Sequence, residues 1–116
     1  MLRLNVNNET SRLKAVVLGI GNSLGSVPTA NECYDPKSRF HVLNRTYPTE
    51  IDIIHQLDFF NDIFLKYKIR VFRPSILKNV NQIFSRDIGF VIGDKFFISN
   101  TIKERSKEIE GLKSLF

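Results

Sequence analysis

The chain has 116 residues, 42% of them hydrophobic and 25% charged, with seventeen basic side chains against twelve acidic ones for a net charge of +5. This composition excludes a disordered chain, and the length fits one domain, which we expect to span residues 1–116. No stretch approaches the roughly 20 apolar residues of a membrane span, and the first residues lack the apolar segment of a secretory signal. The single cysteine makes an intrachain disulfide impossible. We therefore expect a cytoplasmic protein without a membrane partner.

A short buried strand is predicted at Leu13–Gly19, because a compact apolar run with β-branched residues at its centre stops at a glycine. The next segment, residues 20–48, carries glycines and prolines without any sustained apolar period. This pattern predicts a long loop. A loop of this length is uncommon in a compact domain unless it has a function.

The clearest periodic signal follows Thr49. Thr49 is a favourable N-cap, and Glu50 and Asp52 place carboxylates in the first turn, where the helix dipole stabilises them. Apolar side chains then recur at helical spacing and form one stripe: Ile53, Leu57, Phe60, Phe64 and Tyr67. We predict an amphipathic helix that ends near Lys66–Lys68, followed by a strand at Ile69–Arg73 that stops at a proline.

A β-hairpin is predicted where Ile88–Ile92 and Lys95–Ile98 flank a two-residue Gly-Asp turn. A second amphipathic helix is predicted from Asn100 or Thr101 to the last residue, with an apolar side made of Ile102, Ile109, Leu112 and Phe116. No strand follows this helix to cover its apolar side. We therefore expect the chain to be the front part of a longer protein, or to be completed by a partner.

The segment Gly19–Gly25 follows a strand and has the look of a phosphate-binding loop. However, the dinucleotide fingerprint requires a glycine where this chain has Leu24, and no helix is expected to open there. An anion site without a helix N-terminus lacks its main source of positive potential. Nucleotide binding is therefore the third interpretation, behind the two given below.

Other chemistry-bearing side chains indicate neither a nucleophile nor a metal site. Cys33 lies beside Glu32 and Asp35, whose charges oppose formation of a thiolate. His41 and His55 have no second pair of soft ligands, so we expect no metal and no other cofactor. The basic residues of the C-terminal segment alternate with acidic ones, which is typical of a solvated helix face and not of nucleic-acid binding; the favourable i, i+3 pairs are Glu104–Lys107 and Glu110–Lys113.

The compact group Ser85-Arg86-Asp87 comes immediately before the first hairpin strand, at the rim of a sheet. A carboxylate at this place can hold a planar cation such as a guanidinium through a bidentate, charge-assisted hydrogen bond. The commoner alternative is structural: an ion pair between Arg86 and Asp87, or a turn capped by Asp87. The residues by themselves leave both interpretations open.

Three segments, in this order, resemble the enzymes that modify guanidino groups, namely glycine amidinotransferases and their cousins, the arginine deiminases and dimethylarginine dimethylaminohydrolases. The segments are Asn8–Gly19 (NETSRLKAVVLG), Lys68–Pro74 (KIRVFRP) and Gln82–Ser99 (QIFSRDIGFVIGDKFFIS), the last followed by Arg105 and Glu108. The resemblance covers nearly the whole chain apart from residues 20–48.

The resemblance implies a fold and a reaction. The fold is an α/β propeller of five ββαβ units, of which this chain would supply roughly two, as an incomplete propeller with mixed short sheets and two amphipathic helices. The reaction uses a cysteine thiolate that attacks the guanidino carbon and gives a covalent amidino-cysteine, with a histidine as acid and base. For substrate binding, the resemblance implies that Asp87 holds the guanidinium, that Arg86 positions it, and that Glu9 matches the acidic residue of the opening segment.

In that family the catalytic histidine and cysteine come later in the sequence than the segments matched here. The resemblance therefore implies that this chain holds no catalytic residue and is inactive alone. The implied partners are a guanidino-containing small molecule and either the remaining C-terminal part of the enzyme or a second copy of the chain. The alternative is a non-enzymatic α/β module that oligomerises or binds a partner through its open sheet edge.

Overall fold

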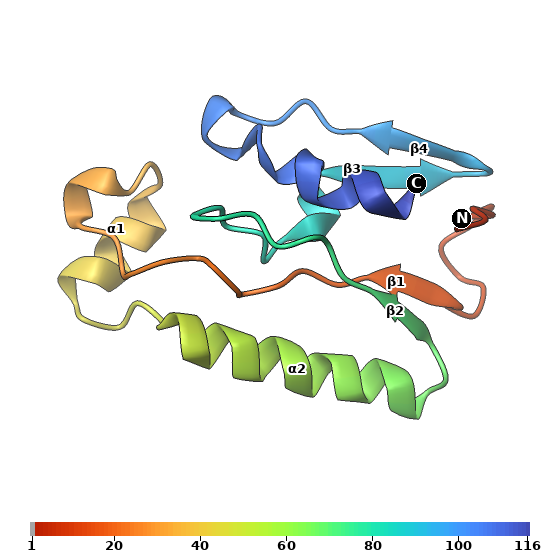
Figure 1. Cartoon of the computed structure of the whole chain (residues 1–116), viewed down its shortest axis with the longest axis horizontal. Helices are drawn as coiled ribbons and strands as arrows, with labels where there is room; N and C mark the ends of the chain where they lie inside the picture. Colours follow the sequence, from red (N-terminus) through yellow and green to blue (C-terminus); the bar gives the residue numbers. More distant parts are fainter. Residues whose placement is uncertain (1) are drawn as a thin grey trace.

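The computed structural model describes residues 2–116, which form a mixed α/β structure with two short sheets (Figure 1). The helices and strands are β1 (Ala15–Val17), α1 (Pro36–Leu43), α2 (Glu50–Lys66), β2 (Arg70–Phe72), β3 (Gly89–Ile92) and β4 (Lys95–Ile98). In Figure 1, α2 lies on one side of the β1–β2 pair and the β3–β4 hairpin lies on the other. The α/β class is confirmed, whereas the propeller arrangement is not shown, because each sheet of the described chain has two strands and neither closes.

The first unit is a parallel pair of strands joined by a segment that contains α2. Val16 lies opposite Val71 in the register, and the Leu18 backbone N–H continues the pairing by donating to the Phe72 carbonyl at 2.9 Å. Gly19 is required after β1, because a Cβ there would collide with the Ile83 carbonyl oxygen. β1 is thereby held between β2 and the segment that leads to the hairpin.

The helix α2 begins at the predicted residue, but fewer side chains of its apolar stripe are buried than predicted. The Thr49 hydroxyl accepts the Asp52 backbone N–H at 3.3 Å, and the Asp52 carboxylate accepts the Thr49 backbone N–H at 3.0 Å, which is a capping box. Ile53 is buried, whereas Phe60 and Tyr67 are exposed. The face of α2 that packs on the sheet is therefore narrower than the sequence pattern indicates.

The predicted β3–β4 hairpin is confirmed. Phe90 pairs with Phe97 and Ile92 pairs with Lys95 in the antiparallel register, and Gly93 takes a φ of +59° in the turn. The rings of Phe90 and Phe97 stack with centroids 5.4 Å apart on the outer, exposed face of the hairpin. Both aromatic rings are thus left on the surface of the described chain.

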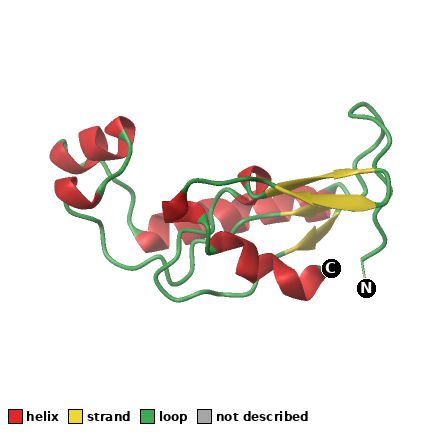
Figure 2. Cartoon of the chain, turned by 90° about the horizontal axis from the view of Figure 1, so that it is seen from above, coloured by secondary structure: helices red, strands yellow, loops and turns green. Residues whose placement is uncertain are grey.

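The prediction of one long loop over residues 20–48 is wrong, because a 3-10 turn (Ala30–Glu32) and α1 form within it. Asp35 caps α1 by accepting the Ser38 backbone N–H at 2.8 Å, and the proline after it supplies the preset φ of a first helical residue. No residue of α1 is buried, so its sequence shows no apolar period. Figure 2 shows this segment, residues 28–47, standing out at one end of the chain; we call it the α1 lobe.

The predicted second amphipathic α-helix is also wrong: the chain forms two 3-10 segments, Lys103–Arg105 and Glu108–Leu115. Gly111, a poor helix former, lies inside the second of these. Its carbonyl oxygen accepts the Ser75 backbone N–H at 2.8 Å and is therefore engaged outside the helix. Of the predicted apolar side, Leu112 is buried and Ile109 is half-buried, whereas Ile102 and Phe116 are exposed.

The apolar core is small and lies where these segments meet. Its buried members are Leu18, Ile20, Ile53, Ile88 and Leu112. The Gln82 side chain, fully buried beside them, donates to the Ser75 carbonyl and accepts the Leu77 backbone N–H, both at 2.8 Å. A buried amide bound at both ends fixes the loop after β2 in one geometry. Within residues 2–116, the helices are all too short or too polar to cross a membrane.

Thr49→Ala is expected to lower the free energy of unfolding by about 1 kcal/mol, because α2 loses its N-cap. Hydrogen bonds from the Thr49 hydroxyl and backbone N–H hold the pKa of Asp52 below its usual value. This stabilisation is present above about pH 4 and is lost as the pH falls through the lowered pKa. Urea denaturation of both proteins at neutral and acidic pH checks this, with Thr101→Ala as the control; an equal loss at both pH values would contradict it.

Candidate functional site

The guanidinium of Arg105 is the most fully bound polar group near the predicted site. Its Nε and Nη2 donate to the two carboxylate oxygens of Glu108 at 2.7 and 3.0 Å, and its Nη1 donates to Asp87 Oδ2 at 3.0 Å. Nη2 also donates to the Phe84 carbonyl at 3.3 Å. Two carboxylates and one carbonyl thus surround one guanidinium. We call Asp87, Arg105 and Glu108 the guanidinium cluster.

Three short segments position this cluster. Asp87 ends the 3-10 turn Ser85–Asp87, whose first residue is buried and donates its hydroxyl to the Val17 carbonyl at 3.0 Å. The turn is therefore anchored at the carboxyl end of β1. Arg105 and Glu108 belong to the two C-terminal 3-10 segments and face each other across one turn. The cluster thus joins the C-terminal segment to the residues that precede β3.

Burial strengthens the ion pair between Arg105 and Glu108, which we call the inner pair of the cluster. The Glu108 side chain is only 3% exposed, and a carboxylate buried this deeply requires a cation. The hydrogen bond with Glu108 raises the pKa of Arg105 above its ordinary value, against the burial that lowers it, and the bond with Asp87 raises it further. Arg105 therefore stays charged and fixed at Glu108.

The outer side of Asp87 faces solvent. Its side chain is 42% exposed, and Oδ1 lies 3.3 Å from the Nε of Arg86, whose own side chain is 87% exposed. The ion pair between Arg86 and Asp87 that the sequence left open is therefore present. An exposed pair of this kind contributes about 0–1 kcal/mol. Arg105 thus holds Oδ2 of Asp87 as a fixed cation, whereas Arg86 holds Oδ1 and is easily displaced.

Glu9 lies apart from the cluster. It is exposed, in a turn where the Asn8 side chain accepts the backbone N–H groups of Thr10 and Ser11. Glu9 precedes the amino end of β1, whereas the turn that carries Asp87 is bound at the carboxyl end of the same strand (Figure 1). The structure therefore brings Arg86 to Asp87 but does not bring Glu9 to either of them.

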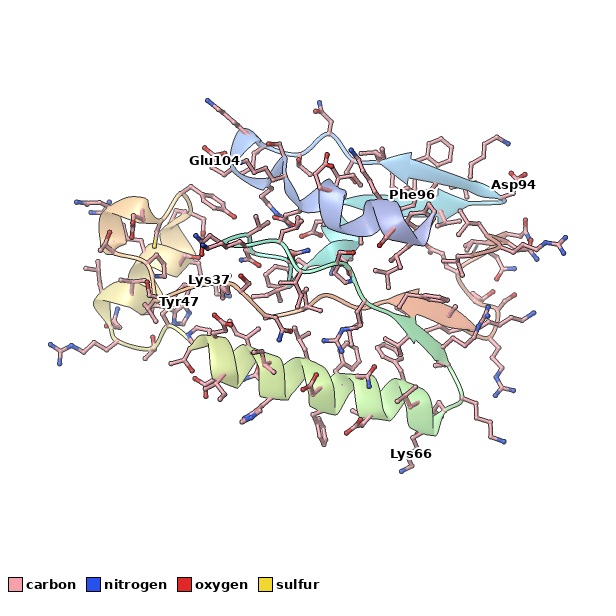
Figure 3. The ribbon with its side chains drawn as sticks, viewed as in Figure 1. Lys37, Tyr47, Lys66, Asp94, Phe96 and Glu104 are labelled. Carbon is pink, nitrogen blue, oxygen red and sulfur yellow. The ribbon has the colours of Figure 1, made fainter. Side chains whose placement is uncertain are left out.

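A cavity of about 580 Å³ opens beside the cluster, between the α1 lobe and the C-terminal 3-10 segments. Glu108 lines it together with Tyr34 and Tyr47 of the lobe, and Figure 3 shows Tyr47 and Glu104 on its two sides. Burial raises the pKa of Tyr34; the Arg105 charge opposes this and the Glu108 charge adds to it. The buried carboxylate of the cluster therefore also forms part of an aromatic and polar cavity wall.

The cysteine and the histidines do not complete a catalytic site. The Cys33 thiol donates to the Thr29 carbonyl at 3.4 Å, His41 Nδ1 lies 2.8 Å from the Thr46 hydroxyl, and His55 is exposed on α2. None of the three is joined to the guanidinium cluster by a hydrogen bond or an ion pair in the described chain. Within residues 2–116, no three His, Cys, Asp or Glu side chains lie close enough to hold a metal ion.

The loop Gly19–Gly25 does bind a carboxylate, but the carboxylate is the chain's own. The backbone N–H groups of Ser23 and Gly25 donate to the two oxygens of Glu50 at 3.0 Å each. A phosphate at this loop would have to displace Glu50, and no helix begins within residues 19–25. The interpretation as a nucleotide site therefore gains no support. Sequence analysis assigned Glu50 only to the helix dipole and missed this contact.

Arg105 and Glu108 belong to the guanidinium cluster, but sequence analysis did not place them in the predicted site. For Arg105 the reason is distance along the chain. Its separation from Asp87 is 18 positions, and neither charge nor periodicity indicates that the two meet. The available signal was the resemblance, whose last segment is followed by Arg105 and Glu108.

No family model and no curated protein matches the chain.

Arg105→Ala is expected to lower the free energy of unfolding by about 3 kcal/mol, because it leaves Glu108 buried without a cation. The matched control is Lys113→Ala, which breaks the exposed pair between Lys113 and Glu110 at 2.7 Å and is expected to cost less than about 1 kcal/mol. Urea denaturation followed by circular dichroism measures both. Equal small losses would contradict a strong inner pair.

Proposed function

We propose that the chain is the N-terminal part of an amidinotransferase-like enzyme that acts on the guanidino groups of arginine-type substrates. In this proposal the chain supplies part of the substrate-binding site. The observation that carries it is the carboxylate of Asp87, which Arg105 fixes on one side and which solvent reaches on the other. The resemblance of Gln82–Ser99 to guanidino-modifying enzymes supports the same assignment.

Asp87 has the properties of a prepared guanidinium acceptor. A substrate guanidinium displaces Arg86 from Oδ1 and forms a charge-assisted hydrogen bond there. The displacement costs little, because an exposed ion pair contributes little. Arg105 keeps the carboxylate oriented throughout, so the site does not have to be ordered when the substrate binds. Arg86, once displaced, remains beside the bound substrate and helps to position it.

The reaction itself requires residues that the guanidinium cluster does not include. In the mechanism implied by the resemblance, a thiolate forms a C–S bond to the guanidino carbon, the bond from that carbon to the departing amine breaks, and a histidine gives the amine its proton. The Cys33 thiol is bound to the Thr29 carbonyl and has acidic neighbours, which suits it poorly to this role. We therefore propose that residues 1–116 bind the substrate without turning it over.

Asp87→Asn is expected to weaken arginine binding at least tenfold, because the amide keeps the shape of the side chain but loses the charge that pairs with the guanidinium. The matched control is Asp94→Asn, which neutralises another exposed carboxylate, one that lies 3.2 Å from the Lys95 ammonium. NMR titration of the wild type and both variants with arginine measures the effect. Ornithine, which has an amine in place of the guanidino group, serves as the control ligand.

Two results would contradict the proposal. Arginine binding that is equal in the wild type and in Asp87→Asn would remove Asp87 from the site. Production of ornithine, citrulline or guanidinoacetate by residues 1–116 alone, incubated with arginine and glycine, would place the chemistry inside this chain. The alternative, a non-enzymatic module that associates through its open sheet edge, stays a prediction; a monomer in size-exclusion chromatography would argue against it.

A further inference from the structure

The α1 lobe, residues 28–47, forms hydrogen bonds only within itself. The Thr29 backbone N–H donates to the Glu32 carboxylate at 2.6 Å, and Asp35 caps α1. Within residues 2–116, no hydrogen bond and no ion pair joins the lobe to the rest of the chain. None of its residues is buried. The lobe is therefore a self-contained unit that little beyond its two connections holds in place (Figure 2).

The base of the lobe, by contrast, is fixed to the rest of the chain. Glu50, the first residue of α2, accepts the backbone N–H groups of Ser23 and Gly25. The Ser23 carbonyl accepts the Asn79 backbone N–H at 2.9 Å. The segment that enters the lobe is thus bound both to α2 and to the loop after β2.

Two short connections lie between this base and the lobe. One is residues 26–27, both exposed, and the other is Pro48. A few loop residues of this kind can absorb the backbone rotation of a hinged unit. The proline ring fixes φ, so rotation at Pro48 is confined to ψ and the motion is narrowed to a swing.

The cavity of about 580 Å³ lies on the inner side of the lobe, and its two walls carry opposite charges. Glu32 and Asp35 line it from the lobe, whereas Lys103 and Lys107 line it from the C-terminal 3-10 segments. Both lysines are exposed, and neither forms an ion pair in the part of the chain that the structure describes. Two carboxylates and two free ammonium groups thus face one another across the cavity.

The wall opposite the lobe keeps an excess of positive charge. It also carries Glu104 and Glu108, but Arg105 compensates Glu108 through two hydrogen bonds. Glu104 alone does not balance both lysines. The lobe is therefore attracted toward this wall.

We propose that the α1 lobe is a lid that swings about residues 26–27 and Pro48 and closes over the cavity, so that Glu32 and Asp35 meet Lys103 and Lys107. Hydrogen bonds within the lobe use Oε2 of Glu32 and Oδ2 of Asp35, which leaves the other carboxylate oxygens for the lysines.

Closure also covers an aromatic side chain. Tyr34 is 56% exposed, and it lines the cavity. The charges of Arg105 and Glu108 act on its pKa, so the phenol faces the opposite wall. Swinging the lobe inward removes part of this ring from water, which favours the closed form. The lid is expected whether or not Asp87 binds a guanidinium, because Asp87 does not line the cavity.

Cys33 reports the position of the lid, because it is the single cysteine and lines the cavity from the lobe. The measurement is the rate at which iodoacetamide, a neutral reagent, alkylates the thiol of the whole chain at low ionic strength, where the closed form is expected to predominate. Lys103→Glu combined with Lys107→Glu is expected to open the lid and to speed alkylation about three- to tenfold. Raising sodium chloride to about 0.5 M is expected to speed alkylation of the wild type, since salt screens the attraction.

The matched control is Lys66→Glu combined with Lys113→Glu, which makes the same change in net charge at two exposed lysines outside the cavity. Its alkylation rate is expected to equal that of the wild type. A rigid lobe gives the opposite sign, because nearby cations stabilise a thiolate and their loss from the cavity wall slows alkylation. Circular dichroism checks that each variant is folded.

NMR relaxation dispersion tests the hinges directly. Lid motions occur on the µs–ms timescale that this method detects. We expect one common exchange process for the amides of residues 28–47, with none in β1 or in the second half of α2. The double variant of Lys103 and Lys107 is expected to change the populations in this process, whereas the control variant is not.

A faster reaction in the cavity variant, an unchanged control and exchange confined to the lobe support the lid. An equal or slower reaction in the cavity variant would overturn it, and so would an equal acceleration in the control, which would reveal an effect of net charge alone. Absence of exchange in residues 28–47 would show a rigid lobe. Exchange that extends through β1 and α2 would show unfolding of the chain and would also overturn the proposal.

Discussion

The buried carboxylate of Glu108 is the constraint on which the site depends. A carboxylate that is 3% exposed must have a cation beside it, and Arg105 supplies that cation. Because the same guanidinium also binds Asp87 and the Phe84 carbonyl, the requirement of Glu108 fixes the turn before β3. The orientation of Asp87 is therefore set from inside the chain, while its outer oxygen stays accessible to solvent.

Polar anchors of this kind join segments that the small apolar core does not hold. Gln82 fixes the loop after β2, the Ser85 hydroxyl ties the turn of Asp87 to the end of β1, and Glu50 closes the glycine loop onto the start of α2. Each anchor pairs a side chain with backbone N–H or C=O groups of a loop or strand end and so fixes the geometry of that segment. Because the apolar core is small, Phe59 of α2 and the paired Phe90 and Phe97 of the hairpin stay exposed within the described chain.

Local signals in the sequence predicted the elements that depend on local physics. The cap at Thr49, the Gly-Asp turn of the hairpin and the strand before Gly19 were all predicted, because each depends on neighbouring residues. Elements governed by distant contacts were not. α1 buries no residue and has no apolar period. In the C-terminal 3-10 segment, the Gly111 carbonyl accepts the Ser75 backbone N–H, a contact 36 positions away that the local pattern does not indicate. Asp87 was singled out from its motif, whereas its contact with Arg105, 18 positions later, is seen only in the folded chain.

In the proposed function, Arg105 stays bound to Asp87 as a structural cation, and Arg86 is the cation that a substrate guanidinium replaces. The most direct measurement is NMR of the Nε–H signals of Arg86 and Arg105 while ethylguanidinium is added to the chain. We expect the Arg86 signal to move toward that of a free side chain in a saturable way, while the Arg105 signal keeps its position and its protection from solvent. Release of Arg105, or no saturable change at Arg86, would contradict the account.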